Sequence, residues 1–204
     1  AGMLYPQQGG GGDGVKQIDY LRLVLAIRAK QLTRPRVIVA IDGRCGSGKT
    51  TLAARLQKNL GCTVFHMDDF FPRPEQRTDE RLSRPGENVD HERFLAEVLR
   101  PLMGARPITY RPYLCASQQL GGIVKTVPGR LVIVEGAYAC HPSLWPYYDL
   151  RIFLSVPAGE QRRRILKRNG AEKAAQFNSR WIPLEERYFK AYDIPLRCDL
   201  RING

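Results

Sequence analysis

No stretch of this sequence approaches the roughly 18 consecutive apolar residues that a membrane-spanning helix requires. The chain begins with a glycine-rich segment that lacks the charged and apolar regions of a signal peptide. Its five cysteines are odd in number and form no Cys-x-x-Cys pair, which argues against a disulfide framework and against a zinc site. We therefore expect a soluble, cytoplasmic protein with reduced thiols and no membrane partner.

Acidic residues are also scarce, because 20 Asp and Glu stand against 32 Lys and Arg and leave a formal net charge of +12. This charge predicts a polyanionic partner, which could be nucleic acid, a nucleotide polyphosphate or a phosphorylated metabolite. The arginine clusters are not interleaved with the aromatic residues on which single-stranded nucleic acids stack. We expect no specific nucleic acid partner, and homo-oligomerisation stays open.

With 204 residues and 43% hydrophobic content, the chain is long enough for one good core and short for two. Residues 1–16 have little to bury, and we predict a disordered N-terminal segment there and a single domain over residues 17–204. Apolar residues at helical spacing predict an amphipathic helix over residues 17–32, which Pro35 ends.

Four apolar segments read as buried strands, at residues 36–42, 63–68, 130–136 and 150–156. Helices are expected between and after them, at residues 49–60, 91–103, 159–168 and 183–192. This alternation predicts an α/β fold, a parallel β-sheet flanked by helices. Residues 108–114 and 122–127 look like an additional, more exposed strand pair.

The segment "VIVAIDGRCGSGKTTL" joins a predicted strand to a predicted helix, and Gly43, Gly48, Lys49 and Thr50 match the phosphate-binding loop G-x-x-x-x-G-K-[ST]. In such a loop the backbone N–H groups surround a phosphate chain, the lysine reaches the β/γ-phosphates and the hydroxyl ligates magnesium. The cofactors expected are ATP and Mg²⁺. The predicted nucleotide-binding residues are Gly43, Arg44, Cys45, Gly46, Ser47, Gly48, Lys49, Thr50 and Thr51.

Two other predicted strands end in carboxylates, Asp68 with Asp69 on one and Glu135 on the other. Ligands gather at the carboxyl ends of the strands in open α/β sheets. Asp68 could accept the proton of an attacking hydroxyl, and Glu135 could hold the magnesium together with Thr50. The alternative is that these carboxylates cap loops or pair with surface arginines.

Several motifs, in this order, resemble the uridine kinase and phosphoribulokinase family of P-loop kinases. They are "GRCGSGKTT", "MDDFF", "NVDHERF", "YRPYLC", "VIVEGAY" and "LRIFLSVPAGEQRRRILKRN", and they extend over about residues 36–204. The resemblance implies a nucleoside-kinase-like P-loop NTPase fold with a short helical lid, about residues 161–181.

The resemblance also implies roles for single residues. Asp68 would be the catalytic base, and Asp90, His91 and Tyr110 would bind the acceptor. Lys49 would act on the phosphates together with Arg164 and Arg168 from the lid, which share a helix face and would neutralise the transferring phosphoryl group. His91 could instead simply begin its helix, and the arginine run could be mostly a solvated face.

After Arg168 this chain continues with "NGAEKAAQFNSRW", whereas nucleoside-specific members have a longer lid with a Glu-Arg-Gly-Arg-like stretch. This departure affects the choice of acceptor more than the kinase assignment. Arg180 could supply a lid cation. Arg77, Arg81 and Arg84 could favour an acceptor that already carries phosphate or carboxylate.

The hypothesis is ATP-dependent phosphoryl transfer to a hydroxyl of a small metabolite, with a nucleoside such as uridine or cytidine as the first candidate. One alternative is a kinase for a non-nucleoside acceptor such as pantothenate or a sugar phosphate. The other is a regulatory or nucleic-acid-binding ATPase, which the charge favours.

Overall fold

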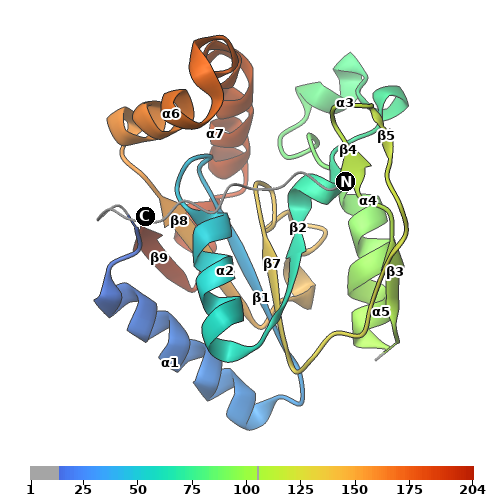
Figure 1. Cartoon of the computed structure of the whole chain (residues 1–204), viewed down its shortest axis with the longest axis vertical. Coiled ribbons are helices and arrows are strands. Elements are labelled where there is room, and N and C mark those ends of the chain that lie inside the picture. Colours follow the sequence, from blue (N-terminus) through green and yellow to red (C-terminus); the bar gives the residue numbers. More distant parts are fainter. Residues whose placement is uncertain (1–13, 105) are drawn as a thin grey trace.

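A five-stranded parallel sheet in the order β2-β7-β1-β8-β9 forms the centre of the computed structural model, which describes residues 14–104 and 106–204 (Figure 1). The predicted α/β fold with a parallel sheet is confirmed. Its strands are β1 (Val37–Gly43), β2 (Thr63–His66), β7 (Leu131–Glu135), β8 (Leu150–Ser155) and β9 (Leu200–Asn203).

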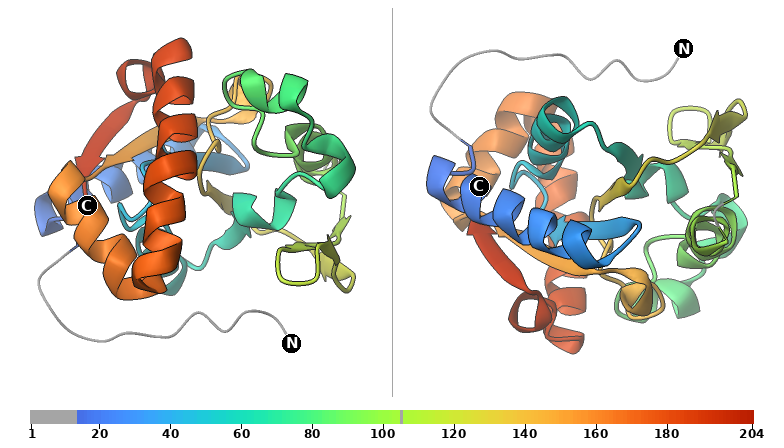
Figure 2. Two further views of the ribbon diagram at one scale, coloured as in Figure 1. Left: turned by 90° about the horizontal axis from the view of Figure 1, so that it is seen from above. Right: turned by 90° about the horizontal axis from the view of Figure 1, so that it is seen from below.

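Helices cover both faces of the sheet, so its central strands β1 and β7 are buried along their whole length and are apolar except for Asp42 and Glu135. Val37, Val39 and Ile41 of β1 face α1 (Gln17–Thr33) and α2 (Lys49–Leu60). The alternate side chains of β1 pack on the opposite core, together with a helical segment of residues 91–103 and with α7 (Ile182–Ala191) (Figure 2). The 91–103 segment contains α4 (His91–Phe94), a π-helical turn (Leu95–Leu99) and α5 (Arg100–Met103).

The second predicted strand ends two residues early. β2 stops at His66, and Met67–Phe70 form a 3₁₀ turn. The partner strand β7 ends at Glu135, which lies opposite His66, so no ladder remains for Met67 and Asp68 to join. The turn places Asp68 and Asp69 just beyond the sheet edge.

The predicted exposed strand pair is present and more elaborate than expected. β3 (Ile108–Tyr110) pairs antiparallel with β6 (Val124–Thr126), and β4 (Tyr113–Leu114) pairs with β5 (Gln119–Leu120). Before this region, the chain after the 3₁₀ turn forms a second short turn at Pro74–Gln76 and the helix α3 (Asp79–Ser83).

The helix predicted at residues 159–168 is longer in the structure, α6 (Ala158–Gln176). It is broken at Gly170, whose φ of 78° and ψ of 171° are not helical. A π-helical turn, Phe177–Trp181, joins α6 to α7, and the predicted lid lies within this stretch. The remaining helical pieces are a turn at Trp145–Tyr147 and α8 (Ile194–Arg197).

Most of the predicted disordered segment, residues 1–13, lies outside the described residues. Of its last residues, Val15 packs beside the core under α1, and Lys16 accepts a backbone hydrogen bond from Tyr20. Within residues 14–104 and 106–204, no helix combines the length and apolar character needed to cross a bilayer.

Candidate active site

The loop between β1 and α2 has the backbone of a phosphate-binding loop. A Cβ atom on Gly43 would lie 2.0 Å from the carbonyl oxygen of Leu154 in β8, so only glycine fits. Gly48 caps α2 in the left-handed region, at φ 93°. The helical ladder of α2 starts with the Leu52 N–H donating to Gly48, so the N–H groups of the first turn point out of the helix end.

The loop holds polar groups that a phosphate chain would satisfy. Lys49 is buried, and its Nζ donates to the loop carbonyls of Gly43 and Arg44 at 2.7 and 2.9 Å. The Ser47 hydroxyl is fully buried and has no hydrogen-bond partner among the described residues. Outward N–H groups, a buried ammonium and an orphaned hydroxyl fit an anionic nucleotide.

A buried aspartate secures the start of the loop. One oxygen of Asp42 accepts the Gly43 N–H at 2.7 Å, and the other accepts the Cys140 N–H at 2.9 Å and the Tyr188 hydroxyl at 2.8 Å. Burial raises the pKa of Asp42 above its ordinary value, while these hydrogen bonds lower it. Asp42 thus ties the loop to the turn after β7 and to α7.

Two consecutive glutamates of α7 also hold the loop. Glu185 is buried and accepts the Cys45 N–H at 3.0 Å, and burial raises its pKa to about 7. Glu186 forms a bidentate pair with Arg44, with distances of 2.5 and 3.0 Å. The position of α7 is therefore coupled to the shape of the loop.

Helix α6 reaches the loop through two side chains. Gln161 donates to the Cys45 carbonyl at 3.0 Å, and Arg164 donates to the Gly46 carbonyl at 3.2 Å while pairing with Glu160. Arg168 contacts Asn169 and lies over the ring of Phe177 instead. The structure therefore brings Arg164 to the loop and leaves Arg168 one turn away.

Oxygen ligands suited to magnesium meet at the ends of α2 and β7. The Thr50 hydroxyl lies 3.2 and 3.3 Å from the two carboxylate oxygens of Glu135, which is buried. His66 Nδ1 lies 2.6 Å from the same carboxylate, whose contact raises the pKa of His66. A hydroxyl beside a carboxylate is a donor set that Mg²⁺ accepts, so the predicted pair fits the ion.

Asp68 and Asp69 have different surroundings. The side chain of Asp68 is exposed to solvent. Nearby protein atoms displace part of its hydration shell and raise its pKa above the ordinary value, and the negative charge of Glu135 raises the pKa further. Lys49 and His66 act on it in the opposite direction. Asp69 accepts the Tyr110 hydroxyl at 3.1 Å, so Tyr110 lies beside Asp69. The charges of Lys49 and Glu135 both act on Asp68.

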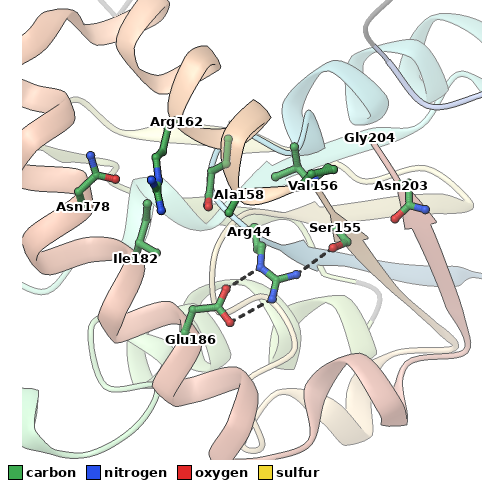
Figure 3. Close-up of a pocket in the computed structure, with 12 residues that line it drawn as sticks. Arg44, Ser155, Val156, Ala158, Arg162, Asn178, Ile182, Glu186, Asn203 and Gly204 are labelled. Atoms are coloured by element: carbon green, nitrogen blue, oxygen red, sulfur yellow. Dashed lines mark hydrogen bonds and ion pairs between the residues drawn. The ribbon is translucent and has the colours of Figure 1, made fainter.

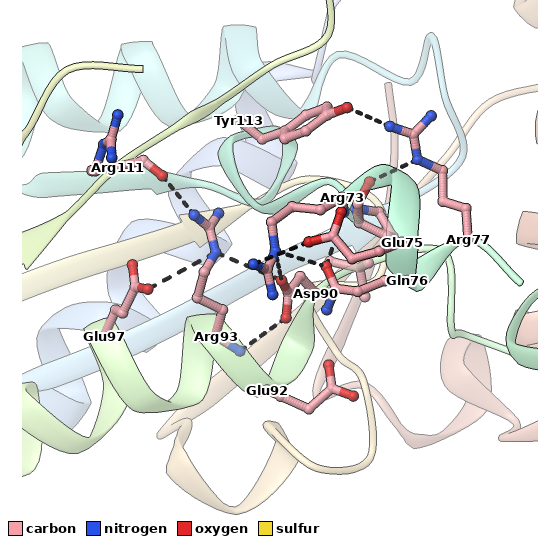
Figure 4. Close-up of polar contacts among 12 residues, drawn as sticks. Arg73, Glu75, Gln76, Arg77, Asp90, Glu92, Arg93, Glu97, Arg111 and Tyr113 are labelled. Carbon is pink, nitrogen blue, oxygen red and sulfur yellow. Dashed lines mark hydrogen bonds and ion pairs between the residues drawn. The ribbon is translucent and has the colours of Figure 1, made fainter. Parts of the chain in front are cut away.

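Asp90 lies behind this group, at the start of α4. Its Oδ1 accepts the Arg93 N–H at 3.1 Å, and its buried Oδ2 has no hydrogen-bond partner among the described residues. The Nε atoms of Arg93 and Arg73 stand 3.7 and 4.0 Å from Oδ2 (Figure 4). An acceptor hydroxyl could donate to this oxygen only if an arginine moved aside, so the role of Asp90 stays a prediction.

His91 points into a different cluster. Its ring stacks on His141 with centroids 4.0 Å apart, and its Nε2 lies 3.4 Å from the Glu87 carboxylate. The three residues have metal-ligating atoms within 4.8 Å of one another. The Nδ1 atom of His141 accepts the Ser143 N–H, so the ring proton of His141 is on Nε2. The Glu87 carboxylate already lies 3.4 Å from the Arg81 guanidinium. A protonated nitrogen and a paired carboxylate do not favour metal binding, so we assign no metal to this cluster.

A pocket of about 1050 Å³ opens on the other side of the loop, where Arg44 bridges Ser155 and Glu186 (Figure 3). It lies between the start of α6 and the end of β9. Further lining side chains include Arg162, Asn178 and Asn203.

The fold and the loop define a P-loop nucleotide-binding protein. A family model described as an AAA domain matches residues 39–190, and the chain belongs to this family of P-loop proteins. A protein named uridine kinase from Staphylococcus aureus strain JH9 is 29% identical over 153 residues, covering 70% of this chain and 72% of the relative. The motif resemblance to uridine kinases is confirmed.

Two solved structures share the fold. One is described as a "putative fructose transport system kinase" from Silicibacter sp. TM1040, with a TM-score of 0.69, 22% identity and coverage of 89% of this chain and 98% of the other. The second, a "possible uridine kinase" from Bacillus stearothermophilus, has a TM-score of 0.59, 22% identity and coverage of 88% and 98%.

Sequence reasoning missed the residues that hold the loop from outside, Asp42, Gln161, Glu185 and Glu186. Each of them has a partner more than a hundred residues away in the sequence. Asp42 carried a local signal, because an acidic residue inside an otherwise apolar strand must have partners where it is buried.

Proposed function

We propose that this protein transfers the γ-phosphoryl group of ATP, with Mg²⁺, to a hydroxyl group of a small metabolite. The observation that supports the proposal is that the phosphate-binding loop, Glu135 and the turn that carries Asp68 meet at the carboxyl edge of β1, β2 and β7, where Glu135 contacts both Thr50 and His66. A binding-only P-loop protein needs the lysine, but it does not need an accessible carboxylate beside it.

In this proposal, Asp68 accepts the proton of the acceptor hydroxyl. Lys49 exchanges its loop carbonyls for phosphate oxygens, and Arg164 adds a second positive charge from α6. Thr50 and Glu135 would hold the magnesium, which supplies charge neutralisation on the phosphates when it is bound. The pocket beside Arg44 has room for the nucleoside part of ATP.

Two classes of acceptor are candidates, a nucleoside and a non-nucleoside metabolite. The uridine kinase relatives favour a nucleoside, whereas the fold is shared with a kinase described for a fructose transport system. A non-nucleoside acceptor such as pantothenate or a sugar phosphate is the second candidate, and the arginines of the 73–93 region favour it.

ADP formation from Mg-ATP, measured for each member of an acceptor panel, tests the proposal. We expect at least one hydroxyl compound to raise ADP formation well above the rate with ATP alone. Detection of the phosphorylated product by mass spectrometry completes the assignment. ATP binding without acceptor-stimulated turnover, together with tight oligonucleotide binding, would favour the nucleic-acid-binding ATPase instead.

A further inference from the structure

Arg77 differs from Arg73, Arg81 and Arg93, the other partly buried arginines of the 73–93 region. Within the described part of the chain, no carboxylate lies within ion-pair distance of Arg77, although its side chain is half-buried. Neighbouring arginines are paired: Arg73 with Glu75 at 3.2 Å, Arg81 with Glu92 at 2.8 Å, and Arg93 with Asp90 at 3.7 Å. A half-buried guanidinium without a counter-charge loses hydration and gains no ion pair in return.

The surroundings of Arg77 fix its orientation. Its Nε donates to the Pro72 carbonyl at 2.9 Å, and Nη2 donates to the hydroxyl of Tyr113 (Figure 4). The guanidinium carbon lies 5.1 Å from the ring centroid of Phe71 and 5.5 Å from that of Tyr113. Nη1 has no hydrogen bond to any described residue, so one edge of a rigidly held cation is available to a ligand.

Arg77 also lies near both the proposed base and the predicted lid. Its guanidinium lies over the ring of Phe71, which directly follows the Met67–Phe70 turn that carries Asp68. Its partner Tyr113 belongs to β4, which packs against the same turn. The ring of Phe71 meets the edge of Trp181, from the turn after α6, with centroids 6.0 Å apart.

We propose that Arg77 binds a carboxylate or phosphate group on the acceptor whose hydroxyl is presented to Asp68. The inference rests on the proposed kinase function and narrows the acceptor to an anionic small molecule. A guanidinium donates two parallel hydrogen bonds to such a group, and stacking on aromatic rings keeps its plane fixed. A neutral nucleoside would leave Arg77 without a counter-charge in the closed complex.

Matched pairs of acceptors test the charge requirement. Pantothenate against panthenol and glycerate against glycerol examine a carboxylate, ribose 5-phosphate against ribose examines a phosphate, and uridine serves as the neutral nucleoside. Binding of each compound is measured by calorimetry, with and without a non-hydrolysable ATP analogue, and turnover is measured as ADP formation. We expect the charged member of at least one pair to bind about 10- to 100-fold more tightly than its neutral partner.

Arg77→Met removes the charge and keeps most of the side-chain volume. We expect it to raise KM for the anionic acceptor about 10- to 100-fold, with kcat changed less and ATP affinity unchanged. Arg77→Lys should recover part of this loss, because it restores the charge without the fork. The control is Arg100→Met, which removes an exposed arginine of α5 and should leave KM within about twofold of the parent.

The proposal is overturned if the neutral members are preferred, if no charged compound binds, or if Arg77→Met and Arg100→Met give the same KM. Equal melting temperatures for the three variants and the parent show that folding is not the cause of an effect. If a charged compound binds in an Arg77-dependent way but is never phosphorylated, the kinase function fails while the anion site stands.

Discussion

Glu185 and Cys45 are joined across the candidate active site, because the backbone N–H of Cys45 in the phosphate-binding loop donates to the carboxylate of Glu185 in α7 at 3.0 Å. The adjacent residues Arg44 and Glu186 form a second, bidentate link. A buried carboxylate is thus held close to the loop in which the phosphates of a nucleotide would lie.

This contact predicts that ATP binding takes up a proton. Burial raises the pKa of Glu185 to about 7, and a bound polyphosphate should raise it further by like-charge repulsion. ATP affinity should therefore fall as the pH rises through 7 to 8. Calorimetry in buffers of different ionisation enthalpy should detect the uptake of part of one proton.

Glu185→Gln should remove this uptake and make ATP affinity nearly independent of pH. Glu186→Gln is the control, because Glu186 is 42% exposed and paired with Arg44, so it should leave the proton uptake in place. Buffer-independent binding enthalpies for the parent protein would contradict the coupling.

Lys49→Ala should lower turnover by about 10²- to 10³-fold, because the variant lacks the positive charge next to the transferring phosphoryl group. The fold should persist, since the lysine makes hydrogen bonds only within its own loop among the described contacts. ATP calorimetry and far-ultraviolet dichroism check the two statements. Lys58→Ala, on the exposed side of α2, is the matched control, and equal activity of the two variants would refute the role of Lys49.

Asp68→Asn should lower kcat by about 10²- to 10⁴-fold and leave ATP affinity within a few-fold. It should leave the melting temperature nearly unchanged, because Asp68 is exposed to solvent. Asp69→Asn keeps an acceptor for the Tyr110 hydroxyl and should cost much less activity. Normal kcat with a lowered melting temperature would assign Asp68 a structural role.

Asp68 should also set the pH dependence of kcat. Only ionised Asp68 can accept a proton, and its pKa is raised above the ordinary 3.8, so activity should disappear on acidification at a higher pH than for an ordinary aspartate. A kcat profile between pH 4 and 8 measures this limb. The limb should be absent from the residual activity of Asp68→Asn.

Arg164→Ala should reduce kcat more than Arg168→Ala, because only Arg164 contacts the loop. Both variants should bind a mixed oligonucleotide as weakly as the parent, with a similar salt dependence. If each substitution instead weakens submicromolar oligonucleotide binding at physiological salt, the arginines form a nucleic-acid surface.

His141 should make the protein less stable in mild acid. Burial lowers its pKa from 6.5 to about 3, so the unfolded chain takes up a proton that the folded chain resists. The contribution of His141 to the free energy of unfolding is fully present above pH 6.5. It decreases as the pH falls toward 3, by about 2 kcal/mol at pH 5. Urea unfolding at pH 7.5 and 5.0 should show a smaller acid loss for His141→Asn, which retains an acceptor for the Ser143 N–H.

The parent and His141→Asn share every other titrating group, so the difference between their acid losses isolates the histidine. Identical losses would show that His141 is protonated without cost in the folded protein.

The sequence predicted the central strands of the sheet well, because strands covered on both faces are almost entirely apolar and the glycine-rich loop marks the end of β1. β9 was missed, since it is a short edge strand with two exposed residues and only Ile202 fully buried. The end of β2 was misplaced, because the length of β7 decides where it stops.

In the site, the sequence indicated which residues carry chemistry but not their partners. Arg164 and Arg168 look equivalent on a helix face, and only the position of α6 over the loop distinguishes them. Likewise, the adjacent Asp90 and His91 face different clusters, because the start of α4 points consecutive side chains in different directions.

The position of β1 in the sheet has a consequence for how the chain folds. β1 lies between β7 and β8, so Val37 pairs with Leu131 and Val39 with Leu150. On a ribosome, both edges of this apolar strand stay unpaired until most of the chain has been synthesised, and α1 and α2 can cover only one of its faces meanwhile. Such non-local pairing favours slow refolding and makes the nascent chain prone to aggregation in the absence of chaperones.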